Sequence, residues 1–76
     1  MNISPRLGRI FLILLEQEEG KTVSADEMAR RIRISRRTLF RELECAWQAL
    51  APYGATLQTR PGLALTGNRE SLAAAL

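Results

Sequence analysis

Two stretches with helical spacing of apolar residues, each preceded by a serine and separated by a short turn, constrain this chain most. The first stretch follows Ser24 and the second follows Ser35. Serine is a preferred N-cap because its hydroxyl oxygen accepts a hydrogen bond from an unpaired N–H of the first helical turn. Glu27 stands three residues after Ser24, which completes a capping-box pattern. Residues 22–50 are therefore predicted to form two helices joined by a tight turn at residues 33–34.

Each predicted helix has one apolar face, so the two helices can pack across each other as a helix-turn-helix. Ile34 in the turn is expected to be buried, and Phe40 and Trp47 are expected in the core or at its rim. Pro52 ends the second helix, because a proline disfavours the α conformation of the residue before it. The inner faces comprise Ala25, Met28, Ala29 and Ile32 in the first helix, and Leu39, Leu43, Ala46, Trp47 and Leu50 in the second.

A core-facing helix is predicted before this stretch. Ser4 suits its N-cap and Pro5 its first position, where the missing N–H has no partner to lose. The helix is expected to fray near Gln17, before Gly20 turns the chain and residues 21–23 continue as an extended segment. Its apolar face recurs at i, i+3, i+4, i+7 and i+8: Leu7, Ile10, Phe11, Leu14 and Leu15.

From residue 55 the apolar residues recur with a period of two, which predicts a β-hairpin. Pro61 and Gly62 suit the central positions of a type II turn, and Asn68 can cap a last helix over residues 69–76. The order helix, short strand, helix, turn, helix, hairpin predicts a mainly α fold with a small β-hairpin. This is the order of a winged helix-turn-helix, a three-helix core with a wing.

The length of 76 residues limits the chain to one small domain. We expect residues 1–66 to form a winged helix-turn-helix DNA-binding domain. Residues 67–76 are expected to start a linker helix to a missing C-terminal regulatory region, because this capped, Ala-rich segment has no C-terminal stop signal.

The residue composition excludes several classes of function. The chain has no His and a single cysteine, Cys45, so it cannot form an internal disulfide and lacks metal-ligand spacing. It also has no Gly-rich phosphate loop and no paired acids in an apolar setting, so we expect no enzyme, no catalytic residue, no metal and no cofactor. No apolar run approaches the roughly 20 residues of a membrane span. With its cysteine usage, this predicts a cytoplasmic protein.

The basic residues point toward nucleic acid. Ten of the eleven are Arg, and the net charge is +3. Arg37, Thr38 and Arg41 are predicted to contact DNA bases, because polar residues in the first turns of a recognition helix reach base edges. Arg37 and Arg41 could instead be a solvated face, but like charges at i, i+4 disfavour a helix that has no partner.

Four other residues are expected to contact the DNA backbone: Ser24, Ser35, Arg36 and Arg60. Helix N-termini offer unpaired N–H groups and a positive dipole end to phosphate, and Arg60 lies at the hairpin turn, where the alternative is a simple exposed turn residue. Arg30 and Arg31 are explained without DNA, because Asp26 precedes Arg30 by four residues and Glu27 precedes Arg31 by four residues, in the stabilising order.

The run VSADEMARRIRISRRTLFRELECAWQAL resembles the helix-turn-helix of bacterial sugar-operon regulators. It is most similar to the N-terminal domain of mannitol-operon activators and other regulators with phosphotransferase-system regulation domains, and it also resembles deoxyribose-repressor-type and biotin-repressor-type domains. Residues 35–39 match the motif S-R-R-T-[IL], and residues 41–43 match R-D-L with Glu for Asp. Leu65-Thr66-Gly67 resembles the end of the family's wing, so the resemblance covers residues 7–67.

The resemblance implies duplex DNA binding near a promoter, usually as a homodimer, in a regulator of a carbohydrate operon. It also implies control by phosphotransferase-system proteins acting on domains absent here. Two positions depart from the family: Arg33 replaces the usual turn glycine, and Leu63-Ala64 replaces a Gly-aromatic pair in the wing. The first departure implies either a left-handed Arg or a different turn.

An alternative function is a winged-helix module for protein interaction or dimerisation, with the second helix of the pair docking an acidic surface. RNA binding is a weaker alternative, because aromatic residues for base stacking make up only 5% of the chain.

Overall fold

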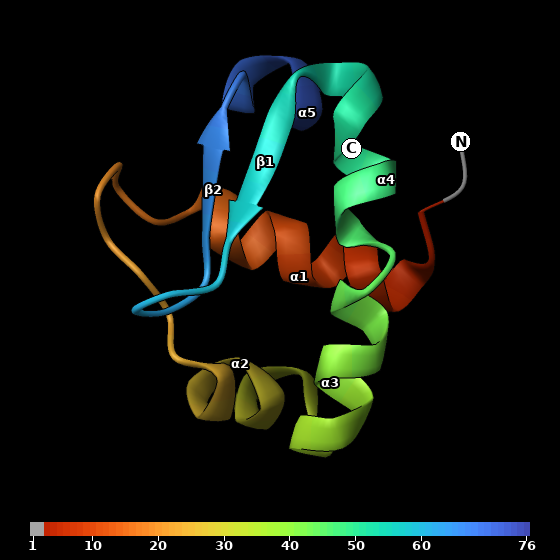
Figure 1. Cartoon of the computed structure of the whole chain (residues 1–76), viewed down its shortest axis with the longest axis vertical. Coiled ribbons are helices and arrows are strands. Elements are labelled where there is room, and N and C mark those ends of the chain that lie inside the picture. The colour runs from red at the N-terminus through yellow and green to blue at the C-terminus, as the bar shows by residue number, and fades with distance from the viewer. Residues whose placement is uncertain (1–2) are drawn as a thin grey trace.

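The computed structural model describes residues 3–76 and has five α-helices with one antiparallel hairpin in that range. The elements are α1 (Pro5–Leu15), α2 (Ala25–Ile32), α3 (Arg36–Leu43), α4 (Ala46–Leu50), the 3-10 helix η1 (Ala51–Tyr53), β1 (Ala55–Gln58), β2 (Ala64–Gly67) and α5 (Arg69–Ala75). α1 crosses the middle of the molecule, with α2 and α3 at one end and the hairpin and α5 toward the other (Figure 1). The prediction of a mainly α fold with a small β-hairpin is confirmed.

A single apolar core holds these elements together. Met28 of α2, Leu39 of α3 and Leu72 of α5 are all fully buried in the same cluster, so α5 packs on the same core as the other helices. In the described part of the chain no polar or charged residue is buried. The apolar face of α1 buries Leu7, Ile10, Phe11 and Leu14 as predicted, whereas its Leu15 is only partly buried. Ala25 of α2, predicted on the inner face of that helix, is also only partly buried.

The predicted helix starts are confirmed by their caps. The side chains of Ser4, Ser24, Ser35 and Asn68 each accept a hydrogen bond from the backbone N–H three residues later, at 3.0–3.2 Å. Each cap satisfies one donor that a helix start leaves without an internal partner. The helix starts were readable from the sequence because each depends on residues three positions apart.

The turn between α2 and α3 is built on a left-handed arginine, one of the two conformations expected for it. Arg33 has φ 59° and ψ 49°, a conformation usually taken by glycine. The Ile34 N–H donates to Ala29 O at 3.0 Å and the Arg33 N–H donates to Arg30 O at 3.3 Å. These are the two hydrogen bonds of a Schellman motif. Ile34 is half-buried rather than buried and packs against the core from the turn.

The prediction of one continuous helix from Arg36 to Leu50 is wrong. The backbone leaves the helix at Cys45, where φ is −92° and ψ −5°, and the Cys45 N–H donates to Glu42 O, three residues back. Trp47, which follows the break and was expected in the core or at its rim, is 45% exposed. Its indole Nε1 instead donates to the carbonyl of Leu57 in β1 at 3.1 Å.

Replacing Trp47 with Phe is expected to destabilise the chain by about 1 kcal/mol, the usual net loss when one hydrogen bond is removed. The change leaves the Leu57 carbonyl without its indole donor and weakens the attachment of the hairpin to α4. Urea unfolding followed by circular dichroism measures the change. A Trp47→Phe chain as stable as the wild type would show that this hydrogen bond contributes nothing.

The predicted type II turn at residues 60–63 is also wrong. That turn needs a positive φ at Gly62, but positive φ among the glycines of the described chain occurs at Gly20, Gly54 and Gly67. The Arg60–Pro61 peptide bond is cis. Gly62 is needed for space instead, because a Cβ there would lie 2.9 Å from the Oγ1 of Thr22 and 3.2 Å from the carbonyl of Val23.

The hairpin turn lies against the segment that precedes α2. Val23 and Leu63 form an antiparallel bridge, with N–H···O distances of 2.9 and 2.7 Å in the two directions. The extended conformation predicted for residues 21–23 is therefore seen as a bridge at Val23. This bridge brings the hairpin turn close to the first turn of α2.

Candidate nucleic-acid interface

α3 presents two cationic side chains that have no acidic partner. Arg37 and Arg41 lie one helical turn apart and are exposed, and among residues 3–76 neither has a carboxylate oxygen within 4.0 Å. Glu44 follows Arg41 by three residues, a spacing that permits an ion pair on a helix, but the two form none. Two guanidinium groups therefore project from one face of α3, and each keeps its planar set of donors for an external acceptor.

At the N-terminus of α3, the side chains of Ser35 and Thr38 are hydrogen-bonded to each other. The Ser35 hydroxyl accepts from the Thr38 N–H at 3.1 Å and donates to the Thr38 hydroxyl at 2.9 Å. Thr38 is half-buried. Because the hydroxyl of Ser35 is used in this way, the donors open to an anion are the backbone N–H groups of Arg36 and Arg37, which have no partner within the helix.

Arg36 differs from Arg37 and Arg41 because it forms an ion pair with a residue of another helix, α2. Its Nη1 lies 2.9 Å from Asp26 Oδ1 in the first turn of α2, and its guanidinium carbon lies 5.5 Å from the centre of the Phe40 ring. The predicted pair between Asp26 and Arg30 is therefore wrong. The Asp26 carboxylate faces α3, so the partner it can reach is the first residue of that helix.

Glu27 carries the ion pairs on the outer face of α2. Its carboxylate accepts from Arg30 at 2.6 Å and from Arg31 at 3.1 Å. The hydrogen bond from Arg31, reinforced by the charge of Arg30, holds the pKa of the Glu27 carboxyl below its ordinary value. The predicted pair between Glu27 and Arg31 is confirmed, and both arginines are occupied within α2.

A groove separates α3 from the hairpin turn, and we call it the α3–hairpin groove. It consists of two adjoining hollows of about 220 and 250 Å³ that share Phe40 and Thr59. The smaller hollow is lined by Ser24 and Arg36 on one side and by Thr59 and Pro61, which flank Arg60, on the other. The structure therefore brings together three regions predicted to contact the DNA backbone. Arg60 itself is exposed at the turn.

Glu42 fixes α3 against α1, a contact that the sequence did not indicate. Its two carboxylate oxygens accept from the hydroxyl of Ser4 at 2.9 Å and from the guanidinium of Arg6 at 3.5 Å. The three residues come from the start of α1 and the end of α3, so only their arrangement in space reveals the pairing. Because Glu42 faces α1, the neighbouring Arg41 is left on the outer surface.

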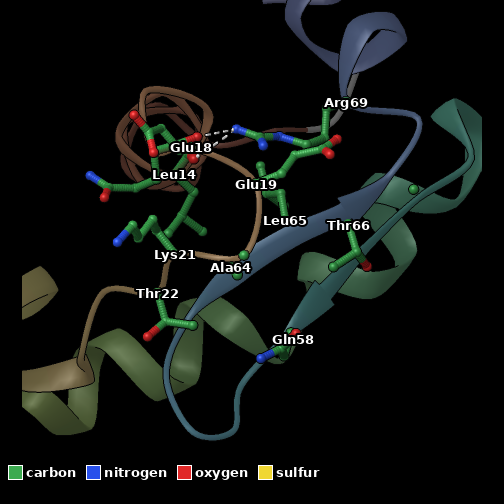
Figure 2. Close-up of a pocket in the computed structure, with 13 residues that line it drawn as sticks. Leu14, Glu18, Glu19, Lys21, Thr22, Gln58, Ala64, Leu65, Thr66 and Arg69 are labelled. Atoms are coloured by element: carbon green, nitrogen blue, oxygen red, sulfur yellow. Dashed lines mark hydrogen bonds between the residues drawn. The ribbon is translucent and has the colours of Figure 1, made fainter.

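A different hollow, of about 320 Å³, lies between the end of α1 and β2, and Figure 2 shows its lining. Arg69, at the start of α5, crosses this hollow to the C-terminus of α1. Its Nη2 donates to the carbonyls of Leu14, Leu15 and Gln17, at 3.3, 3.0 and 2.7 Å. The Leu14 carbonyl also accepts from the Gln17 N–H at 3.2 Å, and Gln17 lies beyond the end of α1. Arg69 thus acts as an additional side-chain cap that attaches α5 to the C-terminal end of α1.

The remaining chemistry of the described residues is limited. Cys45 is a free, exposed thiol, and no group of three or more His, Cys, Asp or Glu within residues 3–76 is arranged to hold a metal ion. None of the helices in this range has the length and apolar character needed to cross a membrane. Comparison of the chain with protein-family models, with curated proteins and with solved structures finds no match.

Proposed function

We propose that this chain is a winged helix-turn-helix that binds duplex DNA sequence-specifically, with α3 as the recognition helix and the hairpin as the wing. The observation that supports it best is the selective pairing of cations in α2 and α3. Arg30, Arg31 and Arg36 all have carboxylate partners, whereas Arg37 and Arg41 have none among the described residues. The cations left without partners are therefore those that a recognition helix would place in the major groove.

In this proposal Arg37, Thr38 and Arg41 contact base edges. A guanidinium can donate two hydrogen bonds to the O6 and N7 of guanine, and Thr38 can contact bases through its hydroxyl or its methyl group. Arg60 lies at the wing, where its cation contacts the DNA backbone. The helix starts at Ser24 and Ser35 contact phosphate, as does Arg36, which lines the α3–hairpin groove together with Ser24.

The biological setting belongs to the same proposal. The resemblance of residues 35–39 and 41–43 to the recognition-helix motif of bacterial sugar-operon regulators favours a cytoplasmic transcription regulator of a carbohydrate uptake or metabolism operon. Such a regulator acts as a homodimer, and phosphotransferase-system proteins control it through further domains.

A second candidate function is a protein-interaction module. It is favoured by two large aromatic side chains that line the groove, Phe40 and Trp47, which are 41% and 45% exposed. Exposed aromatic residues are enriched where proteins associate. In this reading, the α3–hairpin groove accepts a side chain of a partner protein rather than a DNA strand.

Selection from a random duplex library distinguishes the two functions. The chain is used alone and, in a parallel experiment, fused to a dimeric coiled coil that supplies two recognition helices. We expect enrichment of a shared motif, with a palindromic arrangement of it in the dimeric form. If neither form enriches any sequence, DNA reading is excluded and the interaction module becomes the better explanation.

A further inference from the structure

Asp26 of α2 forms an ion pair with Arg36, the first cationic residue of α3. The pair joins the first turn of α2 to the first residue of α3, and its side chains are 62% exposed at Arg36 and 70% exposed at Asp26. Because both groups face water, the pair is weak and a stronger anion can displace it. The ring of Phe40 lies beneath the guanidinium and supports it in this position.

The position of Arg36 makes it the cation that a DNA strand would meet on entering the α3–hairpin groove. The groove carries Ser24 on one side and Thr59 and Pro61, which flank Arg60, on the other. Ser24 and Arg60 are both predicted phosphate contacts. In the structure, Asp26 Oδ1 lies 2.9 Å from Arg36 Nη1, a distance at which a phosphate oxygen could bind the same guanidinium. A carboxylate and a phosphate offer the same charge-assisted hydrogen bonds to a guanidinium.

We propose that Asp26 is an intramolecular competitor of DNA phosphate for Arg36, and that it weakens the binding of α3 to every duplex. This inference depends on the proposed DNA-binding function. Phosphate contacts are independent of sequence, so the competition lowers affinity for random and specific duplexes alike and leaves base reading by Arg37 and Arg41 unchanged. Removing the carboxylate makes Arg36 available for one more phosphate contact.

The test compares Asp26→Asn with Glu27→Gln. Both changes remove one negative charge from the first turn of α2, so they match in net charge and in the loss of a favourable helix-dipole contact. Asp26→Asn frees Arg36, whereas Glu27→Gln frees only Arg30 and Arg31 on the outer face of α2. Binding to a random duplex is measured over a range of salt concentrations, with circular dichroism to confirm that each chain is folded.

We expect Asp26→Asn to bind random duplex on the order of fivefold to tenfold tighter at 0.1 M salt, with a logarithmic salt slope steeper by one phosphate contact, or 0.9. Glu27→Gln is expected to give a much smaller gain. Equal gains by the two variants would overturn the proposal, because net charge alone would then explain them.

A double-mutant cycle that combines Asp26→Asn with Arg36→Gln measures the coupling between the two residues, so the test does not depend on one variant alone. Arg36→Gln is expected to cost more binding in the Asp26→Asn background than in the wild type, because only the former has a free Arg36. Equal costs would overturn the competition while leaving DNA binding intact. If no chain binds any duplex at low salt, the proposed function fails together with this inference, and the two failures are thereby distinguished.

Discussion

Replacing Arg41 with Ala is expected to weaken binding to the selected duplex by about 1–3 kcal/mol and to relax the preference for one base pair. Arg41 is exposed on α3, has no carboxylate within 4.0 Å among the described residues, and follows Arg37 by one helical turn. Its truncation would remove the proposed contact with DNA without breaking an ion pair inside the folded chain. Titration of the selected duplex and of a random duplex measures the two losses separately.

Arg30→Ala is the matched control for Arg41→Ala. It removes the same side chain from α2, where Arg30 is paired with Glu27 and Arg31 remains to pair with that carboxylate. We expect its binding to the selected duplex to stay close to that of the wild type. Equal losses for Arg41→Ala on selected and random duplexes would contradict base reading and assign Arg41 to the phosphate backbone.

Replacing Gly67 with Ala is expected to destabilise the fold by about 3 kcal/mol or more, with contributions from backbone conformation and from a clash. Gly67 has a φ of +84°, and a Cβ there would lie 2.6 Å from the carbonyl oxygen of Gly54. That oxygen accepts from the N–H of Asn68 at 3.0 Å. The added methyl group would therefore disturb both the end of the hairpin and the residue that caps α5.

Gly20→Ala separates the two causes. Gly20 has nearly the same backbone angle, with φ +86°, but no atom lies within 4 Å of the position of an added Cβ. Only the conformational cost applies there, about 1–2 kcal/mol. For a chain of this length each kcal/mol lowers the melting temperature by roughly 4–8 °C, so thermal unfolding resolves the difference. Equal losses at the two positions would show that the clash is relieved without cost.

The sequence was sufficient for features that depend on residues close together in the chain. The caps of α1, α2, α3 and α5 could be predicted because each links a side chain to an N–H three residues away. The buried faces followed from apolar periodicity, and the hairpin followed from the change of period at residue 55. Within the candidate site, the exposure of Arg37 and Arg41 and the pairing of Arg31 with Glu27 could be predicted for the same reason.

The tertiary structure decided which charged and aromatic groups have partners. Asp26 pairs with Arg36 rather than Arg30, Glu42 with Arg6, and Trp47 with the carbonyl of Leu57. These partners lie ten or more residues apart, and their contact depends on how the helices cross and on the break at Cys45.

The distinction between local sequence and tertiary structure also applies to the hairpin glycines Gly62 and Gly67. Their presence marks a turn in the sequence, but Gly62 is required by the approach of Thr22, and Gly67 by both its φ and the carbonyl of Gly54. A side-chain pattern within one turn or strand reports its own local geometry. It carries no information on the distance to a segment from elsewhere in the chain. The exposure of Arg37 and Arg41 could therefore be predicted from the sequence, whereas the ion pair between Arg36 and Asp26 could not.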